Sequence, residues 1–462
     1  MPVPTAESEN CDHIGSLVLL LLALAVHAPA FLGGFIWDDD VYVTANSLLT
    51  SWHGLFRIWF EPGAFRQFYP LSLSGFWLQF QLWGLNPLGY HAVNVLLHAT
   101  NAVLAWRLLR RLAVPWAWLA AALFAAHPVN VESVAWVTEF TTLFSTSLYL
   151  LAMTAGVRAF GLDHTSRGGA VPAGDVACPD RGWLWACLGL FTLAVLAKTV
   201  TCTLPAALLL VIWWQRGRLG WREVRATLPL FGVAALAAVL TMSLESHLGA
   251  QGGIWDMSLA ERILVAGRAM WFYAGKLVWP AGIVFNYPRW VVNPADLWQW
   301  LAPLGILAVL AVLWLGRRRI GRGPLTAVLF FLGTLAPLSG LLSNYYMRYA
   351  WVMHHFQYLA SLGLFALAAA GAHRLARLGA GIHDARSGGE ASGQPEAGDA
   401  DNAQDSAPAR SLVLVRLLAM ITLLVLAGLT WSATAPYRDL ETLYRHTLAS
   451  NADSVLANAN LG

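Results

Sequence analysis

Long apolar segments alternate with short polar ones along nearly the whole chain. A helix needs about 20 mainly apolar residues to cross a hydrocarbon core of about 30 Å, and segments near that length recur from one end to the other. We therefore predict an all-α polytopic membrane protein with about 11 transmembrane helices. They are expected at about residues 15–35, 90–109, 114–126, 140–157, 183–197, 201–214, 226–244, 297–315, 324–342, 356–375 and 411–431.

Two further apolar segments lack the character of a span. Residues 71–83 are aromatic but short, and they lie within a large first loop, 36–89. Residues 261–278 are interrupted by Arg268 and Lys276. Apolar helices of this kind can lie in the membrane interface. We therefore predict an interfacial helix in the first loop and a re-entrant or interfacial helix at 261–278.

Arginines follow several of the predicted spans, at 107–111, 216–225 and 317–322. Basic residues concentrate in the short cytoplasmic connections of membrane proteins, so a cytoplasmic N-terminus places all three clusters inside. The first loop and Lys198 then lie on the extracytoplasmic side.

The chain is predicted to contain a membrane domain at 1–434 and short extracytoplasmic helices at 435–462. Within the membrane domain, residues 376–410 are rich in Gly, Ala, Asp and Glu and almost lack large apolar residues, which is typical of a disordered cytoplasmic linker. In the tail, leucines are spaced like the apolar faces of two short helices joined at 451–453.

The composition agrees with this pattern. Of the 462 residues, 57% are hydrophobic and only 12% are charged, about half the charged share of a soluble protein. The mean hydropathy is +0.55. The net charge of +3 gives no indication of a nucleic-acid partner. The N-terminus lacks the basic region of a signal peptide, so we expect the first span to be retained.

Candidate chemistry gathers on the predicted extracytoplasmic side. The most unusual stretch is Trp37-Asp38-Asp39-Asp40, directly after the first span. A single acid there could be only a solvated loop residue, a buried histidine could be a satisfied core residue, and a lysine or arginine could extend its charge to the headgroups. The polar residues that share this side include Asp38, Asp39, Asp40, His91, Glu132, Lys198, Arg289, Arg348 and His355.

The position of these groups separates several functions. A solute carrier places its charged groups near the bilayer midplane on broken helices, whereas here they lie at span ends. That favours surface chemistry on a substrate with a membrane-embedded tail, because a carboxylate can accept a hydroxyl proton and cations can stabilise a departing phosphate. A non-catalytic anchor that presents the C-terminal helices and a transporter of a lipid-linked substrate remain alternatives.

The chain resembles the TMTC-type protein O-mannosyltransferases and their bacterial relatives, which join a GT-C membrane domain to tetratricopeptide repeats. The matching segments include FIWDDDVYVTANSLL, AHPVNVESVAW, LAKTVTCTLPAALLLVIWW, KLVWPAGIVFNYPRW and RYAWVMHHFQYLASLG. The tail resembles the start of a first repeat. The family usually has a basic pair where Phe140 and Thr141 stand, and an acid where His354 stands, so no charged role is transferred to these positions.

The resemblance implies a GT-C-like bundle and a lipid-phosphate-sugar-dependent glycosyltransferase. Asp38 and Asp39 match the acidic pair of the first loop. We expect Asp39 to act as the base, Asp38 to orient it or the acceptor, and Glu132 to be a second acid near the substrate. The residues expected to bind the donor or to orient the sugar are Asp40, His91, Lys198, Arg289, Arg348 and His355.

The expected reaction moves mannose or a similar hexose, with inversion, from a polyprenyl phosphate to a protein hydroxyl or a glycan. The expected partners are this sugar lipid, an extracytoplasmic acceptor and the membrane lipids, with no nucleic acid. The mechanism needs no cofactor, although Asp38 and Asp39 could hold Mg²⁺ or Mn²⁺, which prefer oxygen ligands. The expected location is a bacterial inner membrane with the site facing the periplasm, and the alternative is the ER membrane with the site facing the lumen.

Overall fold

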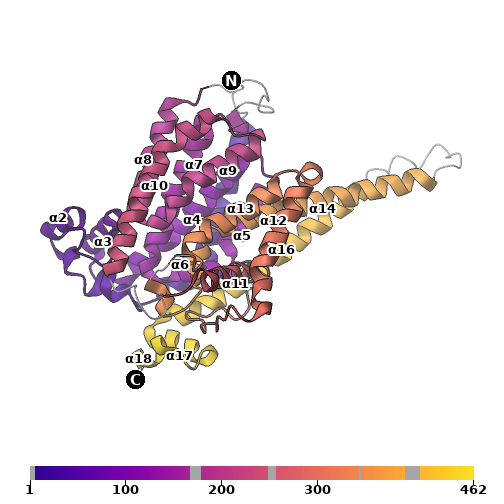
Figure 1. Ribbon diagram of the computed structural model, residues 1–462. Helices are drawn as coiled ribbons and strands as arrows, with labels where there is room; N and C mark the ends of the chain where they lie inside the picture. The colour runs from indigo at the N-terminus through magenta and orange to yellow at the C-terminus, as the bar shows by residue number, and fades with distance from the viewer. Residues whose placement is uncertain (1–5, 167–177, 248–255, 343–344, 391–405, 462) are drawn as a thin grey trace.

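The computed structural model describes residues 6–166, 178–247, 256–342, 345–390 and 406–461. These residues form helices and connecting loops without a β-strand, so the predicted all-α class is confirmed (Figure 1). Every apolar segment predicted to span the membrane contains a helix. These helices are α1 (Ala6–Val26), α4 (Pro87–Arg111), α5 (Ala117–Ala126), α7 (Phe140–Ala159), α8 (Arg181–Ala197), α9 (Leu204–Arg216), α10 (Trp221–His247), α12 (Leu301–Ile320), α13 (Gly323–Leu335), α14 (Ser361–Glu390) and α16 (Ser406–Thr434).

Length and composition support the membrane assignment. Five described helical segments are long and apolar enough to cross a membrane, and four shorter apolar helices accompany them. The segment Val137–Ala159 has 83% of its apolar window buried, whereas Leu297–Ile320 has none. Helix α7 is therefore the centre of the bundle, and α12 lies at its periphery.

Shorter elements shape the loops. The first loop contains α2 (Trp52–Phe60) and α3 (Pro70–Trp83), and α3 matches the predicted interfacial helix. Helix α11 (Leu259–Val278) occupies the second segment predicted to be re-entrant or interfacial. The other short elements near the site are η1 (Ala28–Leu32), η2 (Asp40–Thr44), η3 (Ser47–Thr50), η4 (Pro128–Asn130), α6 (Val131–Ala135), η5 (Val137–Glu139), η7 (Thr199–Thr203), η11 (Tyr345–Arg348), η12 (His354–Gln357) and η13 (Ala435–Arg438).

The chain ends in two short helices, as its leucine spacing predicts. They are α17 (Leu440–Ser450) and α18 (Val455–Leu461), separated by residues 451–454. They pack on the membrane domain, because Ser454 Oγ donates a hydrogen bond to Asn286 Oδ1 (2.9 Å). The tail also reaches the segment just before the first loop, since the Gly34 amide donates to the Arg438 carbonyl (2.8 Å).

One predicted boundary is wrong, and one helix continues into the expected linker. The first span was expected to continue to Phe35, but α1 ends at Val26 and the 3-10 helix η1 follows, because Pro29 cannot donate a backbone hydrogen bond and interrupts an α-helix. The linker was expected to begin at Ala376, but α14 remains helical to Glu390. Residues 391–405 of the expected linker lie outside the described residues.

Contacts between helix ends define two opposite ends of the bundle. At the first, Arg110 of α4 binds Asp12 of α1, and Arg111 binds Asp163 just after α7. The Arg216 guanidinium at the end of α9 donates to the Phe160 carbonyl at the same end. We call this the arginine end; the start of α1 lies there, and α17 and α18 lie at the other end (Figure 1).

Small residues allow the central helices to approach closely. Ala99 and Ala102 of α4, Ala120 of α5 and Ala152 of α7 are fully buried in one apolar cluster. Membrane helices associate through such close packing, because lipid tails are as apolar as the helices and provide little hydrophobic driving force. The rigid core thus fixes the ends of α4, α7 and α8, where the polar residues lie.

Candidate active site

The acidic stretch of the first loop is held by aromatic rings. Trp37 has a φ of 39°, a left-handed conformation that costs a non-glycine residue about 1–3 kcal/mol and must be imposed by its surroundings. Its indole stacks on Trp136 at 5.3 Å between ring centroids, and it meets the edges of Phe285 (5.2 Å) and Tyr349 (5.4 Å). The loop is therefore fixed against three other segments of the chain.

Asp39 is a buried carboxylate with both oxygens engaged. Oδ1 accepts hydrogen bonds from the Thr138 amide (2.7 Å) and hydroxyl (2.6 Å), and Oδ2 accepts one from the Ile36 amide (2.8 Å). Burial raises the pKa of Asp39 to about 7, and the hydrogen bonds from Ile36 and Thr138 act against that rise. This geometry connects the first loop to the start of α7.

Asp38 is different, because among the described residues its carboxylate accepts no hydrogen bond and forms no ion pair. Partial burial raises its pKa to about 6; the nearby Arg66 charge opposes the rise, and the charges of Asp40 and Glu139 add to it. The interaction with His355 lowers the pKa of Asp38. A carboxylate with such a pKa is mainly ionised at neutral pH and is still basic enough to accept a proton.

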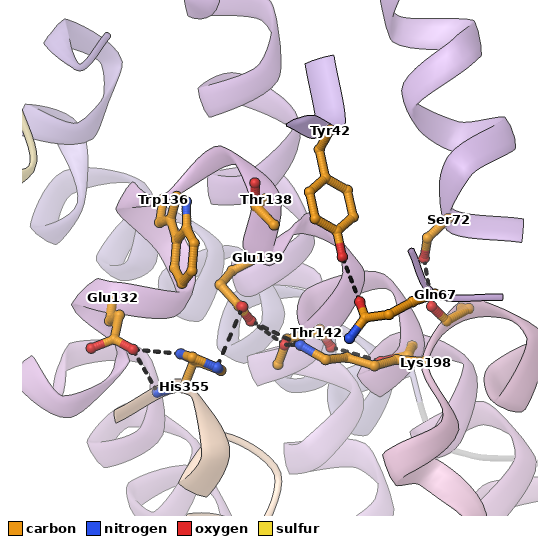
Figure 2. Close-up of polar contacts among 12 residues, drawn as sticks. Tyr42, Gln67, Ser72, Glu132, Trp136, Thr138, Glu139, Thr142, Lys198 and His355 are labelled. Atoms are coloured by element: carbon orange, nitrogen blue, oxygen red, sulfur yellow. Dashed lines mark hydrogen bonds and ion pairs between the residues drawn. The ribbon is translucent and has the colours of Figure 1, made fainter. Parts of the chain in front are cut away.

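Glu139 and His355 act electrostatically on Asp38, and both belong to a row of buried ionisable groups (Figure 2). The His355 Nδ1 lies 2.5 Å from Glu132 Oε1, and its Nε2 lies 3.6 Å from Glu139 Oε1. The Lys198 ammonium lies 3.2 Å from Glu139 Oε2 and donates to the Thr142 hydroxyl at 2.6 Å. We call Glu132, His355, Glu139 and Lys198 the polar row. It brings together α6, the residue before α7, the residue after α8, and η12.

Several buried polar atoms around the polar row lack a hydrogen-bond partner among the described residues. Such atoms are rare in folded proteins, and each one calls for an explanation, such as a bound ligand or water. Here they cluster on the segment that carries Glu132 and on the histidine that faces it. The atoms are Glu132 Oε2, Ser133 Oγ, Trp136 Nε1 and His355 Nε2.

Other predicted residues take supporting or peripheral places. His91 is buried, and its Nε2 lies 3.3 Å from the Gly34 carbonyl, which orients the chain just before the acids. Asp40 is exposed and accepts from the Val41 amide at 2.6 Å, at the start of η2. Arg289 and Arg348 are exposed and form no ion pair with a described residue. They therefore lie outside the polar row.

The sequence interpretation missed Glu139, the residue that joins His355 to Lys198. Its signal was available, because an acid directly before the apolar segment of α7 needs a buried partner as much as Glu132 does. It also missed the Tyr42 hydroxyl, which donates to Gln67 Oε1 at 2.6 Å (Figure 2). Both positions depend on contacts that the local pattern does not contain.

The described residues contain no group of three or more His, Cys, Asp or Glu side chains arranged to hold a metal ion. The Asp39 oxygens are occupied by protein donors, so Asp38 and Asp39 do not offer a shared set of free ligands. Whether the reaction depends on a metal stays a prediction.

Two cavities lie in this part of the molecule, one near the first loop and one among the helices of the bundle. One, of about 270 Å³, lies between Pro128, the segment 280–285, the end of α16, η13 and α17. Phe285, which lines it, also contacts the Trp37 ring. Another, of about 300 Å³, is almost entirely apolar and lies among α4, α7, α9, α13 and α14. Its lining suits a hydrocarbon chain rather than polar chemistry.

These features define a polytopic membrane protein with a buried acid, histidine and lysine network at one end of its helix bundle. No family model matches the chain. The chain is 29% identical over 196 residues to the protein O-mannosyl-transferase TMTC2 of Mus musculus, covering 40% of this chain and 23% of that protein. It is 36% identical over 184 residues to the Drosophila melanogaster protein O-mannosyl-transferase Tmtc2, covering 34% of this chain and 20% of that protein. The resemblance to TMTC-type proteins is thus confirmed, over about a fifth of the length of these relatives.

A solved structure is also similar. It is ArnT from Cupriavidus metallidurans bound to undecaprenyl phosphate, with a TM-score of 0.41 and 14% sequence identity. The alignment covers 94% of this chain and 77% of that one.

Proposed function

We propose that this chain is a GT-C-type membrane glycosyltransferase, which transfers a sugar from a polyprenyl phosphate to a hydroxyl acceptor at the membrane surface. The observation that carries the proposal is Asp38, a half-buried carboxylate without a hydrogen bond from the described residues, beside a buried polar row with unpartnered atoms. The names of the TMTC-type relatives support the same class of reaction.

Asp38 is the base in this proposal. The acceptor hydroxyl oxygen attacks the anomeric carbon of the sugar, and its proton passes to the Asp38 carboxylate. The bond from the anomeric carbon to the phosphate oxygen breaks, and the lipid phosphate leaves with the electron pair. One displacement inverts the anomeric configuration. Positioned general bases typically contribute about 10²–10⁴-fold to such a rate.

Asp39 has a positioning role rather than the role of base that its place in the sequence suggested. Its two oxygens accept three hydrogen bonds from Ile36 and Thr138, and its side chain is buried, so it is less available to a substrate than Asp38. It holds the loop so that the neighbouring Asp38 faces the polar row.

The leaving phosphate needs cations that the protein has not already neutralised. Lys198 lies against Glu139, so its charge is partly compensated, whereas Arg66, Arg289 and Arg348 are exposed and form no ion pair with a described residue. We infer that these arginines bind the donor phosphate, because guanidinium groups form bidentate hydrogen bonds with phosphate. Lys198 and His355 orient Glu139 and Glu132 toward the sugar.

We further propose a mannose or similar hexose as the sugar, and an extracytoplasmic protein or glycan as the acceptor. The site then faces the periplasm of a bacterial inner membrane, since the arginine end matches the cytoplasmic side of a membrane protein. No resident metal takes part in this scheme.

The proposal is tested with the purified full chain in lipid nanodiscs. Radiolabelled polyprenyl-phosphate mannose and glucose are supplied as donors, and a mixture of extracytoplasmic proteins serves as the acceptor. We expect transfer of one of these sugars, and a loss of at least 100-fold in Asp38→Asn. Asp453→Asn, which removes an exposed acid of the tail, is the charge-matched control.

Two results would contradict the scheme. Full transfer by Asp38→Asn excludes it as the base, and transfer that then disappears in Asp39→Asn returns that role to Asp39. Absence of any sugar product, together with movement of the sugar lipid across vesicle membranes, identifies a transporter instead. Capture of partner proteins by the tail, without binding of the sugar lipid, identifies an anchor.

A further inference from the structure

A second cavity with a polar lining lies at the arginine end, far from the acidic loop. It has a volume of about 650 Å³, and its lining combines three arginines with two tryptophans and two glycines. The helices α9, α12 and α13 meet there, side by side (Figure 1). The residues are Trp213, Gly217, Trp314, Arg317, Arg318, Gly321 and Arg322.

The three guanidinium groups of this cavity lack acidic partners. Within the described part of the chain, Arg317, Arg318 and Arg322 form no ion pair, whereas the nearby Arg216 is paired with Glu223 at 2.6 Å. Three like charges around one cavity repel one another. An anion that enters the cavity would relieve this repulsion, because guanidinium groups bind phosphate oxygens with charge-assisted hydrogen bonds.

The cavity is built rather than formed by loose surface side chains. The Trp213 and Trp314 rings lie nearly parallel at 6.1 Å, the Arg317 guanidinium lies 3.8 Å from the Trp314 ring centroid, and that of Arg322 lies 5.9 Å from Trp213. Gly217 has a φ of +76°, and a β-carbon there would overlap the Arg322 guanidinium. Glycine is therefore needed for Arg322 to approach α9.

The surroundings indicate a ligand that belongs to the membrane. Trp213 and Trp314 are partly exposed at the ends of apolar helices, and tryptophan concentrates at the headgroup level of a bilayer. Helix α13 begins at Gly323, directly after Arg322, so the positive end of its dipole adjoins the cavity. We propose that this cavity binds the phosphate of an anionic phospholipid headgroup.

Titration of the detergent-purified full chain with phosphatidylglycerol tests the proposal, with phosphatidylcholine and inorganic phosphate as separate probes. Bound lipid is counted by native mass spectrometry. We expect phosphatidylglycerol to bind at least tenfold more tightly than phosphatidylcholine. The triple variant Arg317→Gln, Arg318→Gln, Arg322→Gln should lose this preference. A matched triple variant, Arg218→Gln, Arg222→Gln, Arg225→Gln, removes equal charge from exposed positions outside the cavity and should keep it.

A second pair of variants removes no charge. Gly217→Ala should reduce the preference for phosphatidylglycerol several-fold by displacing Arg322, whereas Gly232→Ala, where a β-carbon meets open space, should not. Thermal unfolding shows whether Gly217→Ala keeps its fold; if it does not, the triple variants decide. Equal losses in both triple variants would overturn the proposal, because general surface charge would then explain the binding. Complete displacement of phosphatidylglycerol by millimolar inorganic phosphate would also overturn it, in favour of a soluble anion.

Discussion

The two ends of the helix bundle differ in how deeply they bury their charged side chains. At the end with the first loop, Glu132, Glu139 and Lys198 lie buried and contact one another or a histidine. At the arginine end, Arg110 and Asp12 are both more than a third exposed, and the arginines around the cavity have no acidic partner in the described chain. That end also contains two largely buried ion pairs, Arg111 with Asp163 and Arg216 with Glu223, so only part of its charge is solvated.

Buried charged groups and exposed arginines differ in what they can do: the first have altered chemistry, and the second influence the orientation of the protein in the membrane. Burial strengthens electrostatic interactions and shifts the pKa of carboxyl groups, as the values for Asp38 and Asp39 show. Solvated arginines gain little from their pairs, but they favour the cytoplasmic side during insertion. Substitutions should therefore have large effects in the polar row and small effects at the exposed arginines of the other end.

The largest expected effect on stability is at Lys198. Its side chain is 11% exposed and that of Glu139 is 2% exposed. Lys198→Met leaves the Glu139 charge buried without this cation, which should lower the free energy of unfolding by about 3–5 kcal/mol. The double variant Lys198→Met, Glu139→Gln should recover part of the loss. Thermal unfolding in detergent measures both, and a double variant no more stable than Lys198→Met would contradict this account of the pair.

Asp39→Asn should have the next largest effect. Its amide group can replace one oxygen but turns a donor toward the Thr138 or Ile36 amide, so a buried hydrogen bond is lost at a cost of about 1–3 kcal/mol. We expect lower stability and lower transfer together. Asp38→Asn should lower transfer alone, and a fall in stability as large as that of Asp39→Asn would show that Asp38 is structural.

The pH dependence of transfer should follow Asp38. Since burial raises its pKa to about 6, kcat/KM should fall about tenfold per pH unit below 6. Stability should change in the opposite sense. A carboxyl with a raised pKa holds its proton more tightly when folded, so this contribution is complete below about pH 4 and is lost as the pH rises toward 6. Profiles of rate and of unfolding between pH 4 and 8 measure both. A rate profile without an inflection near pH 6 would exclude Asp38 as the titrating base.

The smallest expected effect is at Arg110, in the arginine end. Its pair with Asp12 is partly exposed, so Arg110→Gln should change the free energy of unfolding by less than about 1 kcal/mol. Transfer should stay within about twofold of the unsubstituted chain. Measured alongside Lys198→Met, this variant tests the contrast between the two ends. A loss of stability comparable to that of Lys198→Met would contradict the contrast between the two ends.

The local pattern predicted more of the helices than of the site. The apolar content located α3 and α11, and the leucine spacing located the two tail helices, because both are local properties of the sequence. The local pattern placed the end of α1 wrongly, since proline interrupts that helix, and it did not predict that α14 continues to Glu390. It also found Asp38, Glu132, Lys198 and His355 as unusual polar groups, but it could not say which of them touch.

The sequence by itself determined that this chain is a helical membrane protein with its acids after the first span. Hydrophobicity and helix length are local properties, so they can be counted along the chain. Only the tertiary structure decided which polar groups contact one another. It directed Thr138 onto Asp39, 99 residues away, and so left Asp38 as the unengaged acid. It also placed His355 between Glu132 and Glu139, because burial makes each charge depend on partners that the fold supplies.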